Sequence, residues 1–174
     1  MSDDEKRKEW QIEDLFRYPV SQKRIEIVHL QMVKESRWLY GPRRFISPQE
    51  TVDIVRPLVN MADRELVLVM SLNTKLEPMA VEIVSIGGLD FCNIDVSNVF
   101  KHAILSNASC IICFHNHPSG DPTPSKEDRV VNKRLAEAGR LLGVQLLDNI
   151  IIGESAFYSF REQDDADLEI VRTG

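Results

Sequence analysis

Two histidines one residue apart, followed by a serine and an aspartate, are the residues of this sequence best suited to chemistry. They are His115, His117, Ser125 and Asp128. The apolar run 110–114 predicts a buried strand that ends at the histidines. Because side chains two positions apart on a strand share a face, both imidazoles can approach one point. Two neutral nitrogens and one carboxylate suit zinc, which in catalytic sites keeps three protein ligands and leaves a fourth position for water. The sequence therefore predicts a hydrolase-type zinc site at His115, His117 and Asp128.

The acid end of this motif also has a purely structural explanation. Ser125 and Asp128 are spaced as a capping box, with a serine at the N-cap of a helix and an acid three residues later. The capping box accounts for these two residues and leaves the histidine pair unexplained. Both roles are compatible, since a carboxylate has two oxygens. The remaining histidines, His29 and His102, are interpreted as ordinary surface or core residues.

The cysteines do not indicate a second metal or redox site. There are three of them, an odd number that fits a reducing compartment better than a disulfide framework. Cys110 and Cys113 have the Cys-x-x-Cys spacing, but residues three apart on a strand face opposite sides, and no second pair follows. We interpret both as buried strand cysteines.

Composition and charge exclude several classes of protein. The chain has 174 residues, enough for one domain with a real core, and a net charge of −6. That charge argues against sequence-independent binding to nucleic acid, because such binding depends on phosphate neutralisation by Lys and Arg. No apolar run approaches the roughly 18 residues of a membrane span, and the first residues have no signal-peptide core. We expect a cytoplasmic protein with no membrane partner.

Hydrophobic periodicity and turn residues predict alternating helices and strands. The expected helices are 48–61, 96–106 and 126–142, the last one closed by Gly143, and the expected strands are 66–70, 80–86, 110–114, 144–152 and 158–160. In the second helix the apolar residues Val99, Phe100, Ala103 and Ile104 should face inward. Before residue 45 we expect a short amphipathic helix and one or two strands. This pattern predicts an α/β fold with helices packed on a mixed sheet.

The metal motif resembles that of the JAMM (JAB/MPN) metalloprotease superfamily. In particular, the sequence of residues 115–128 resembles that of the bacterial RadC branch. It reads His-Asn-His-Pro-Ser-Gly-Asp-Pro-Thr-Pro-Ser-Lys-Glu-Asp. Residues 71–75 and 146–153 support the same resemblance, which covers about residues 45–160. The chain departs from the branch at Asn149, where a histidine is usual, and at Gly87-Gly88, where Gly-Thr is usual.

The resemblance implies a fold, a domain organisation and a general base. The fold would be a cytidine-deaminase-like α/β/α sandwich with a mixed central sheet. Residues 45–160 would form the JAB/MPN domain, 1–44 an N-terminal extension without a helix-hairpin-helix, and 161–174 an acidic, frayed tail. JAMM proteins use a glutamate at the start of the strand after the first long helix, and Glu65 stands there, with Glu82 as the alternative. Ser125 would steady the developing oxyanion by hydrogen bonding.

Three functions follow from this resemblance. The first is zinc-dependent hydrolysis of a peptide or isopeptide bond in a protein or peptide substrate. The second is a DNA-associated protein, because the RadC branch carries a DNA-repair label, although the negative net charge argues against it. The third is a catalytically silent scaffold of the same fold, as in some MPN relatives. The intact ligand set favours the hydrolase.

Overall fold

The computed structural model describes residues 29, 32–33, 47–60, 62–87 and 94–163. The helix and strands expected before residue 45, and most of the acidic tail, lie outside these residues. The described elements all fall in one compact unit, residues 31–174. In chain order they are α1 (Pro48–Val59), β1 (Leu66–Leu72), β2 (Pro78–Ile86), α2 (Val96–Leu105), β3 (Cys110–Asn116), α3 (Lys126–Leu142), β4 (Gln145–Ile152) and β5 (Phe157–Ser159).

The five strands form one mixed sheet in the order β2-β1-β3-β4-β5. Only β3 and β4 are parallel, and α3 connects them, while the other neighbouring pairs are antiparallel. The strand that contains His115 and ends just before His117, β3, therefore lies in the middle of the sheet. All seven of its residues are buried, as expected for a strand covered on both faces.

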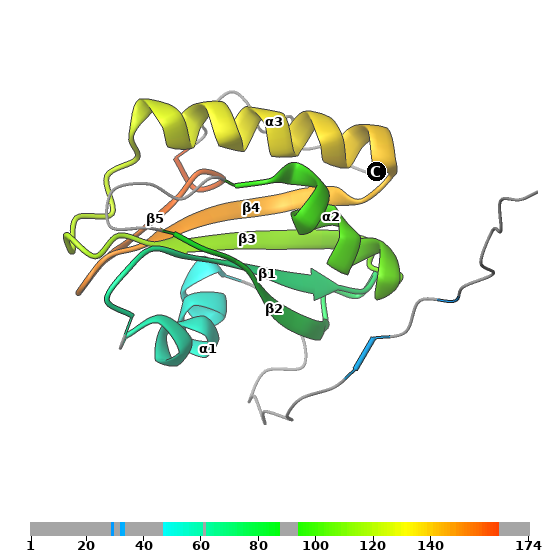
Figure 1. The fold of residues 1–174 in the computed structure, drawn as a ribbon, viewed down its shortest axis with the longest axis horizontal. Helices are drawn as coiled ribbons and strands as arrows, with labels where there is room; N and C mark the ends of the chain where they lie inside the picture. The colour runs from blue at the N-terminus through cyan, green and yellow to red at the C-terminus, as the bar shows by residue number, and fades with distance from the viewer. Residues whose placement is uncertain (1–28, 30–31, 34–46, 61, 88–93, 164–174) are drawn as a thin grey trace, which may run out of the picture. The chain divides into compact units, whose positions relative to one another are not determined.

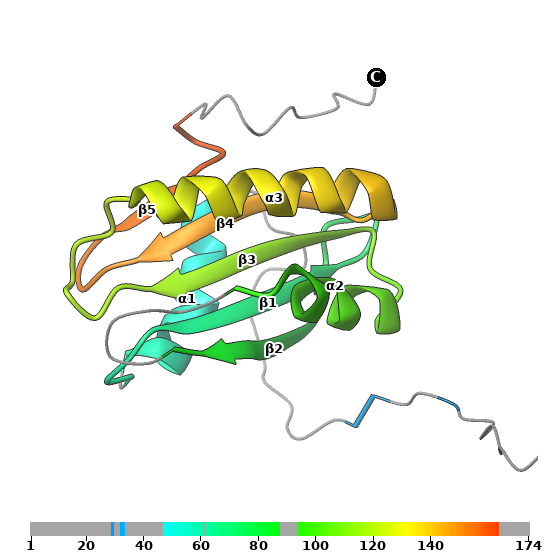
Figure 2. The same cartoon turned by 45° about the horizontal axis from the view of Figure 1, so that its top comes forward.

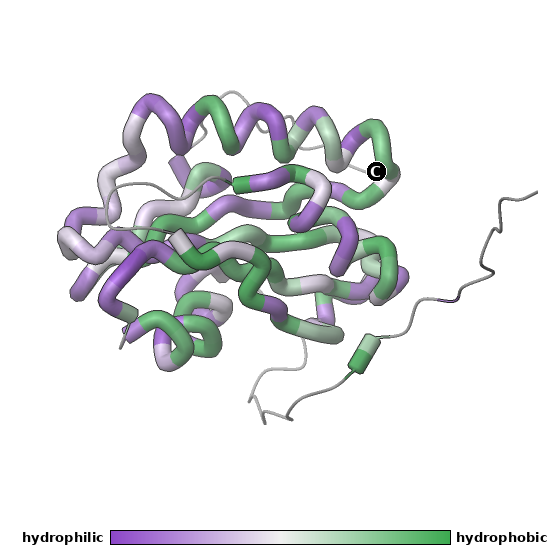
Figure 3. Tube along the Cα trace, in the orientation of Figure 1, coloured by the Kyte–Doolittle hydropathy of each residue, from purple (hydrophilic) through white to green (hydrophobic). Residues whose placement is uncertain are grey.

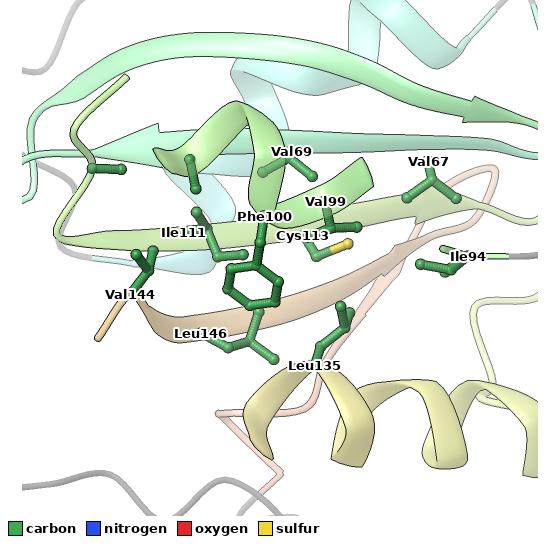
Figure 4. Packing of buried hydrophobic residues seen from close by; sticks show 12 residues of the cluster. Val67, Val69, Ile94, Val99, Phe100, Ile111, Cys113, Leu135, Val144 and Leu146 are labelled. Atoms are coloured by element: carbon green, nitrogen blue, oxygen red, sulfur yellow. The ribbon is translucent and has the colours of Figure 1, made fainter. Parts of the chain in front are cut away.

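Helices cover both faces of the sheet, as Figures 1 and 2 show. On one face α1 contributes Val52, Val55 and Val59 to a core cluster with the sheet. On the other face α2 and α3 pack on a second cluster, which includes Phe100 and Leu135 (Figure 4). Cys110 belongs to the first cluster and Cys113 to the second, so the two thiols diverge, as predicted. The predicted α/β sandwich with a mixed sheet is confirmed.

The helices begin and end where their sequence signals lie. Ser47 and Ser125 are the N-caps of α1 and α3, and each makes a capping box with an acid three residues later. Gly143 ends α3 in the left-handed conformation, with φ of 70°. Hydrophilic and hydrophobic residues alternate along α3, the pattern of a helix with one face on the sheet (Figure 3). None of the helices that the structure describes has the length and apolar character of a membrane span.

The inward face of α2 differs from the prediction at one position. Ile104 was expected to face inward, but it is 53% exposed. His102, which is 5% exposed, takes a place against the sheet, and its Nδ1 lies 3.1 Å from the Ser71 hydroxyl of β1. A polar side chain can be buried there because it has this hydrogen-bond partner. The prediction for Ile104 was therefore wrong, and His102 is a satisfied core residue.

One buried carboxyl group connects β4 to β5. Asp148 accepts hydrogen bonds from the Ser159 hydroxyl and from the backbone N–H groups of Asn149 and Arg161. Burial raises the pKa of Asp148 to about 6, although these hydrogen bonds oppose the increase. The folded protein thus keeps the proton on this group to a higher pH than the unfolded chain does.

We expect this carboxyl group to make the stability of the protein depend on pH. Its folded-state pKa lies above the unfolded value of 3.8, so its contribution is fully present below that value and is lost as pH rises to about 6. The difference of about two pKa units corresponds to at most about 3 kcal/mol. Asp148→Asn should remove this dependence. Urea unfolding in the presence of chelator between pH 4 and 8 should show the wild type losing stability relative to Asp148→Asn, and parallel curves would contradict the assignment.

Candidate metal centre

Three side chains that could hold a metal ion come together at the end of β3. His115, His117 and Asp128 each offer one ligand atom, and these atoms lie within 4.8 Å of one another. The Nε2 of His115 is 3.2 Å from Asp128 Oδ1, and the Nε2 of His117 is 3.6 Å from Asp128 Oδ2. The structure therefore brings together all three of the ligands predicted from the sequence.

The spacing of these atoms fits zinc. With bonds of about 2.0–2.1 Å and tetrahedral angles, neighbouring ligand atoms around zinc lie about 3.3 Å apart. Each histidine nitrogen lies near this distance from one of the two oxygens of the Asp128 carboxylate, at 3.2 Å from Oδ1 for His115 and 3.6 Å from Oδ2 for His117. The His115 Nε2 is buried and, apart from its 3.2 Å contact with Asp128 Oδ1, has no hydrogen-bond partner, as expected of a nitrogen that binds a metal ion. The ligand set, two imidazoles and one carboxylate, is also a catalytic zinc set.

The two histidines are held in different ways. His115 lies within β3, opposite Val67 of β1, on the face covered by α2 and α3. His117 follows the strand and is fixed by two hydrogen bonds: its backbone N–H donates to Ile152 O, and its ring Nδ1 lies 2.8 Å from Asp121 O. An Nδ1–H that donates to a backbone carbonyl leaves Nε2 unprotonated and free to bind metal.

The loop after His117 is fixed against the turn between β4 and β5. Glu154 N–H donates to Gly120 O at 3.0 Å, and a Cβ on Gly153 would lie only 2.3 Å from that same oxygen. Gly120 itself has φ of +84°, in the region that favours glycine. These two glycines allow the close approach that fixes the loop between the second histidine and α3.

Asp128 reaches the histidines from the first turn of α3. Its Oδ2 accepts hydrogen bonds from the backbone N–H and the hydroxyl of Ser125, at 2.7 and 2.6 Å. Burial raises the pKa of Asp128, but its interactions with His115, His117 and Ser125 outweigh this and hold the pKa far below its usual range. The carboxylate is thus ionised at neutral pH, as a metal ligand must be. Of the two roles that the sequence suggests for Ser125, helix capping and catalysis, the structure shows the capping role.

Glu65 lies beside the histidines, whereas Glu82 does not. In the antiparallel register Val67 pairs with His115, so a continuation of this register by two residues brings Glu65 level with His117. Pairing with Asp128 is the main reason that the pKa of His117 is raised; burial opposes the increase, and the charge of Glu65 adds to it. Glu82 is exposed on β2, and its charge acts on His102. Of these two carboxylates, Glu65 is thus the one whose charge acts on the ligand cluster.

Asn116 is a residue of the site that the sequence analysis missed. It lies between the two histidines, and its amide donates to Arg64 O at 3.1 Å and accepts from Leu66 N–H at 2.8 Å. These bonds fix the backbone on both sides of Glu65 against the end of β3. The strand alternation that brings the histidines together also turns Asn116 away from them, but its partners lie about fifty residues earlier, and no local pattern indicates them.

We expect Asn116→Ala to destabilise the protein and to leave the metal ligands in place. The substitution leaves a backbone N–H and a backbone carbonyl without their partner, at a cost of about 1–3 kcal/mol. Urea unfolding in chelator measures this loss, and Asn60→Ala, at an exposed position after α1, is the control. An unfolding free energy that is equal for Asn116→Ala and the wild type would contradict the role of this amide.

A mixed sheet between helices, with two histidines at the end of its middle strand and an acid at the start of the next helix, defines a JAB/MPN-like α/β protein. Residues 45–165 match the family model of the RadC-like JAB domain. The chain therefore belongs to the RadC-like JAB family.

Curated relatives of the chain include bacterial proteins named UPF0758. The protein from Listeria monocytogenes serotype 4b (strain CLIP80459) is 43% identical over 116 residues, which cover 67% of this chain and 52% of the relative. A Geobacillus protein is 43% identical over 129 residues, covering 74% and 57%, and a Thermotoga maritima protein is 48% identical over 101 residues, covering 58% and 46%. The chain thus spans about half the length of the curated relatives it matches.

Proposed function

We propose that this protein is a zinc-dependent hydrolase of the JAMM type that cleaves a peptide or isopeptide bond. The observation that carries the proposal is the cluster of His115, His117 and Asp128, whose ligand atoms lie within 4.8 Å of one another. The interaction between Glu65 and His117 adds a candidate base beside this cluster. A ligand set with an adjacent carboxylate is what hydrolysis by an activated water requires.

In this proposal His115, His117 and Asp128 hold the zinc ion. A zinc ion held by these three residues would supply Lewis-acid chemistry, that is, a water of lowered pKa and a polarised substrate carbonyl. Glu65 accepts a proton from the attacking water and passes it to the leaving amine, the ordinary task of a general base that then acts as an acid. The charge of Glu65 acts on His117, which supports a position of this carboxylate next to the ligand cluster.

Ser125 has the second catalytic role in this proposal. Its hydroxyl donates to Asp128 Oδ2 at 2.6 Å, while the backbone N–H of Ser125 donates to the same oxygen. If the hydroxyl hydrogen rotates toward the substrate, the backbone N–H still holds Asp128. Ser125 can therefore donate to the developing oxyanion without releasing the metal ligand.

We assign this activity to residues 45–160 as the JAB/MPN domain, with 1–44 as an N-terminal extension and 161–174 as an acidic tail. The substrate we propose is a protein or peptide, because the amide bond is the one that JAMM relatives hydrolyse. We propose a cytoplasmic location, where the cysteines stay reduced.

A library of internally quenched peptides and isopeptide-linked peptides tests the proposal. We expect zinc-loaded protein to cleave at least one class of these amides, and a chelator to abolish the cleavage. Activity should return when zinc is added back in excess of the chelator. Zinc-loaded protein that is inert on every peptide and isopeptide would refute the hydrolase function.

The DNA-associated alternative is tested with the same sample. Gel shifts at low salt with duplex, forked and single-stranded DNA favour the strongest electrostatic binding. The net charge of −6 leads us to expect no shift. Binding to one of these DNA forms, together with the absence of amide cleavage, would favour the alternative. A chain that binds zinc but neither cleaves amides nor binds DNA would be the silent scaffold.

A further inference from the structure

Within the part of the chain that the structure describes, three buried side chains contain nitrogen or oxygen atoms without a hydrogen-bond partner. They are His115, Asn132 and Asn149, and in each of them both polar side-chain atoms lack a hydrogen bond, although Nε2 of His115 contacts Asp128. Asn132 and Asn149 are 0% exposed, and His115 is 3% exposed. Buried polar groups in folded proteins almost always have a partner, because a buried group without one has lost its hydrogen bonds to water and gained none in exchange. Two complete amides without partners in one small domain therefore need an explanation.

The three side chains lie on the same side of the sheet. Asn149 of β4 pairs with Cys113 of β3, and Cys113 belongs to the core cluster beneath α2 and α3. His115 lies two residues after Cys113, and so on the same face. Asn132 is on the buried face of α3, three residues before Leu135, which points from α3 toward the strands in Figure 4. All three side chains are thus between the sheet and α3.

They also lie close together along the strands. Asp128 of α3 contacts His115, which fixes the helix and strand at one level. Asn132 follows Asp128 by four residues, about 6 Å along the helix. The pair formed by Cys113 and Asn149 precedes His115 by two residues, about 7 Å along the strand. Because α3 runs back along the sheet, these two displacements bring both amides to a similar level along the strands, on the same face as His115 and further from the strand end.

The two histidines of the cluster differ in one respect. The Nδ1 of His117 lies 2.8 Å from Asp121 O, which orients that ring. The Nδ1 of His115 has no such partner, although metal-binding histidines almost always donate their other ring N–H to an oxygen. The amides on the same face as His115 offer oxygens that can complete this arrangement. A buried water that binds about three unsatisfied polar groups is a common way to connect such atoms.

We propose that Asn132 and Asn149 hold one internal water molecule that accepts the hydrogen bond from Nδ1–H of His115. This inference rests on the proposed zinc site and assigns to it two positioning residues. The water and the amides would favour the proton on Nδ1, so that Nε2 of His115 is free to bind the metal ion beside Asp128. Partners of this kind typically change metal affinity by about 10–100-fold.

A matched pair of substitutions on β4 separates this role from simple packing. Asn149→Val and Asn149→Thr introduce side chains of nearly the same shape, both smaller than asparagine and both suited to a strand. They differ only in that valine has a methyl group where threonine has a hydroxyl group. We expect Asn149→Val to bind zinc about 10–100-fold more weakly than the wild type, and Asn149→Thr to remain within about threefold of it. Competition with a chromophoric chelator measures the affinities. Asn132→Leu, on the facing helix, should weaken binding as much as Asn149→Val.

The stability of the two metal-free variants should not follow the order of their zinc affinities. Valine leaves no polar group to satisfy, so metal-free Asn149→Val should be at least as stable as Asn149→Thr while it binds zinc less tightly. Spectra of protein with ¹⁵N-labelled histidine give a further measurement. The Nδ1 proton of His115 should exchange with solvent faster in the valine variant than in the wild type or the threonine variant.

The controls distinguish this inference from the zinc site itself. Ser71→Ala removes the partner of another buried histidine on the same face of the sheet, and it should lower stability without changing zinc affinity. Equal zinc affinities for Asn149→Val and Asn149→Thr would overturn the role of the amides and leave the zinc site standing. A wild-type protein that binds no zinc would overturn the site and this inference together.

Discussion

Replacement of both His115 and His117 by alanine should abolish zinc binding and leave a folded protein. We expect about one zinc per chain in wild-type protein purified without chelator, and less than about a tenth of that in the double variant. Zinc bound by four protein ligands has an apparent binding free energy of about 10–16 kcal/mol, or about 3 kcal/mol for each ligand. Loss of two ligands should therefore weaken binding by about ten-thousandfold. Metal analysis after exhaustive dialysis measures the difference.

The control for this experiment is the other buried histidine of the described structure. His102 lies on the same side of the sheet, but its partner is Ser71 and it is not part of the ligand cluster. His102→Ala should keep its zinc even if it unfolds at a lower temperature. Zinc that survives the double substitution, or that disappears equally in His102→Ala, would mean that the ligands lie elsewhere. Circular dichroism of each variant establishes that it is folded.

Glu65→Gln should abolish hydrolysis and retain zinc. The amide keeps the shape of the side chain but cannot accept the proton of the attacking water, so we expect the rate to fall by about 10²–10⁴-fold. The three proposed ligands are untouched, which predicts an unchanged metal content. The rate is measured on the peptide or isopeptide that the wild type cleaves, with the zinc content of each sample determined in parallel.

The matched control is the second candidate for the base. Glu82 is on β2, and its charge acts on His102 rather than on the ligand cluster. Glu82→Gln should therefore cleave at the wild-type rate. The opposite result, a slow Glu82→Gln and an active Glu65→Gln, would transfer the role to Glu82. If Glu65→Gln is inactive but still binds the substrate, it can also be used to capture that substrate.

The ligand cluster could be predicted from the sequence because its signals are local. His115 and His117 are two residues apart at the end of an apolar strand, and Asp128 follows an N-cap serine at the start of a helix. Strand periodicity and helix capping act over a few residues, so the sequence alone indicates that these side chains converge. The same local rules gave the bounds of α3, which the structure confirms at both ends.

The rest could not be predicted because it depends on contacts between distant residues. In the sequence, Asn116 has no visible role other than to separate two histidines. In the structure, the backbone at the start of β1 lies beside it and supplies two hydrogen-bond partners. On α2 the residue that faces the sheet is His102 and not Ile104, because Ser71 of β1 provides a hydrogen bond to the buried imidazole. Asn132 and Asn149 look like ordinary polar residues of a helix and a strand, and only the assembled sheet shows that both are buried.

The proposed ligands and the proposed base come from separate parts of the chain. His115, His117 and Asp128 belong to one continuous segment, whereas Glu65 precedes β1 and is tied to that segment by the amide of Asn116. Evolution could therefore change one without the other. A single substitution at Glu65 would turn such a hydrolase into a metal-dependent binding protein that still recognises its former substrate. Regulators that shield a bond from cleavage could arise in this way from enzymes that cut it, with fold and metal unchanged.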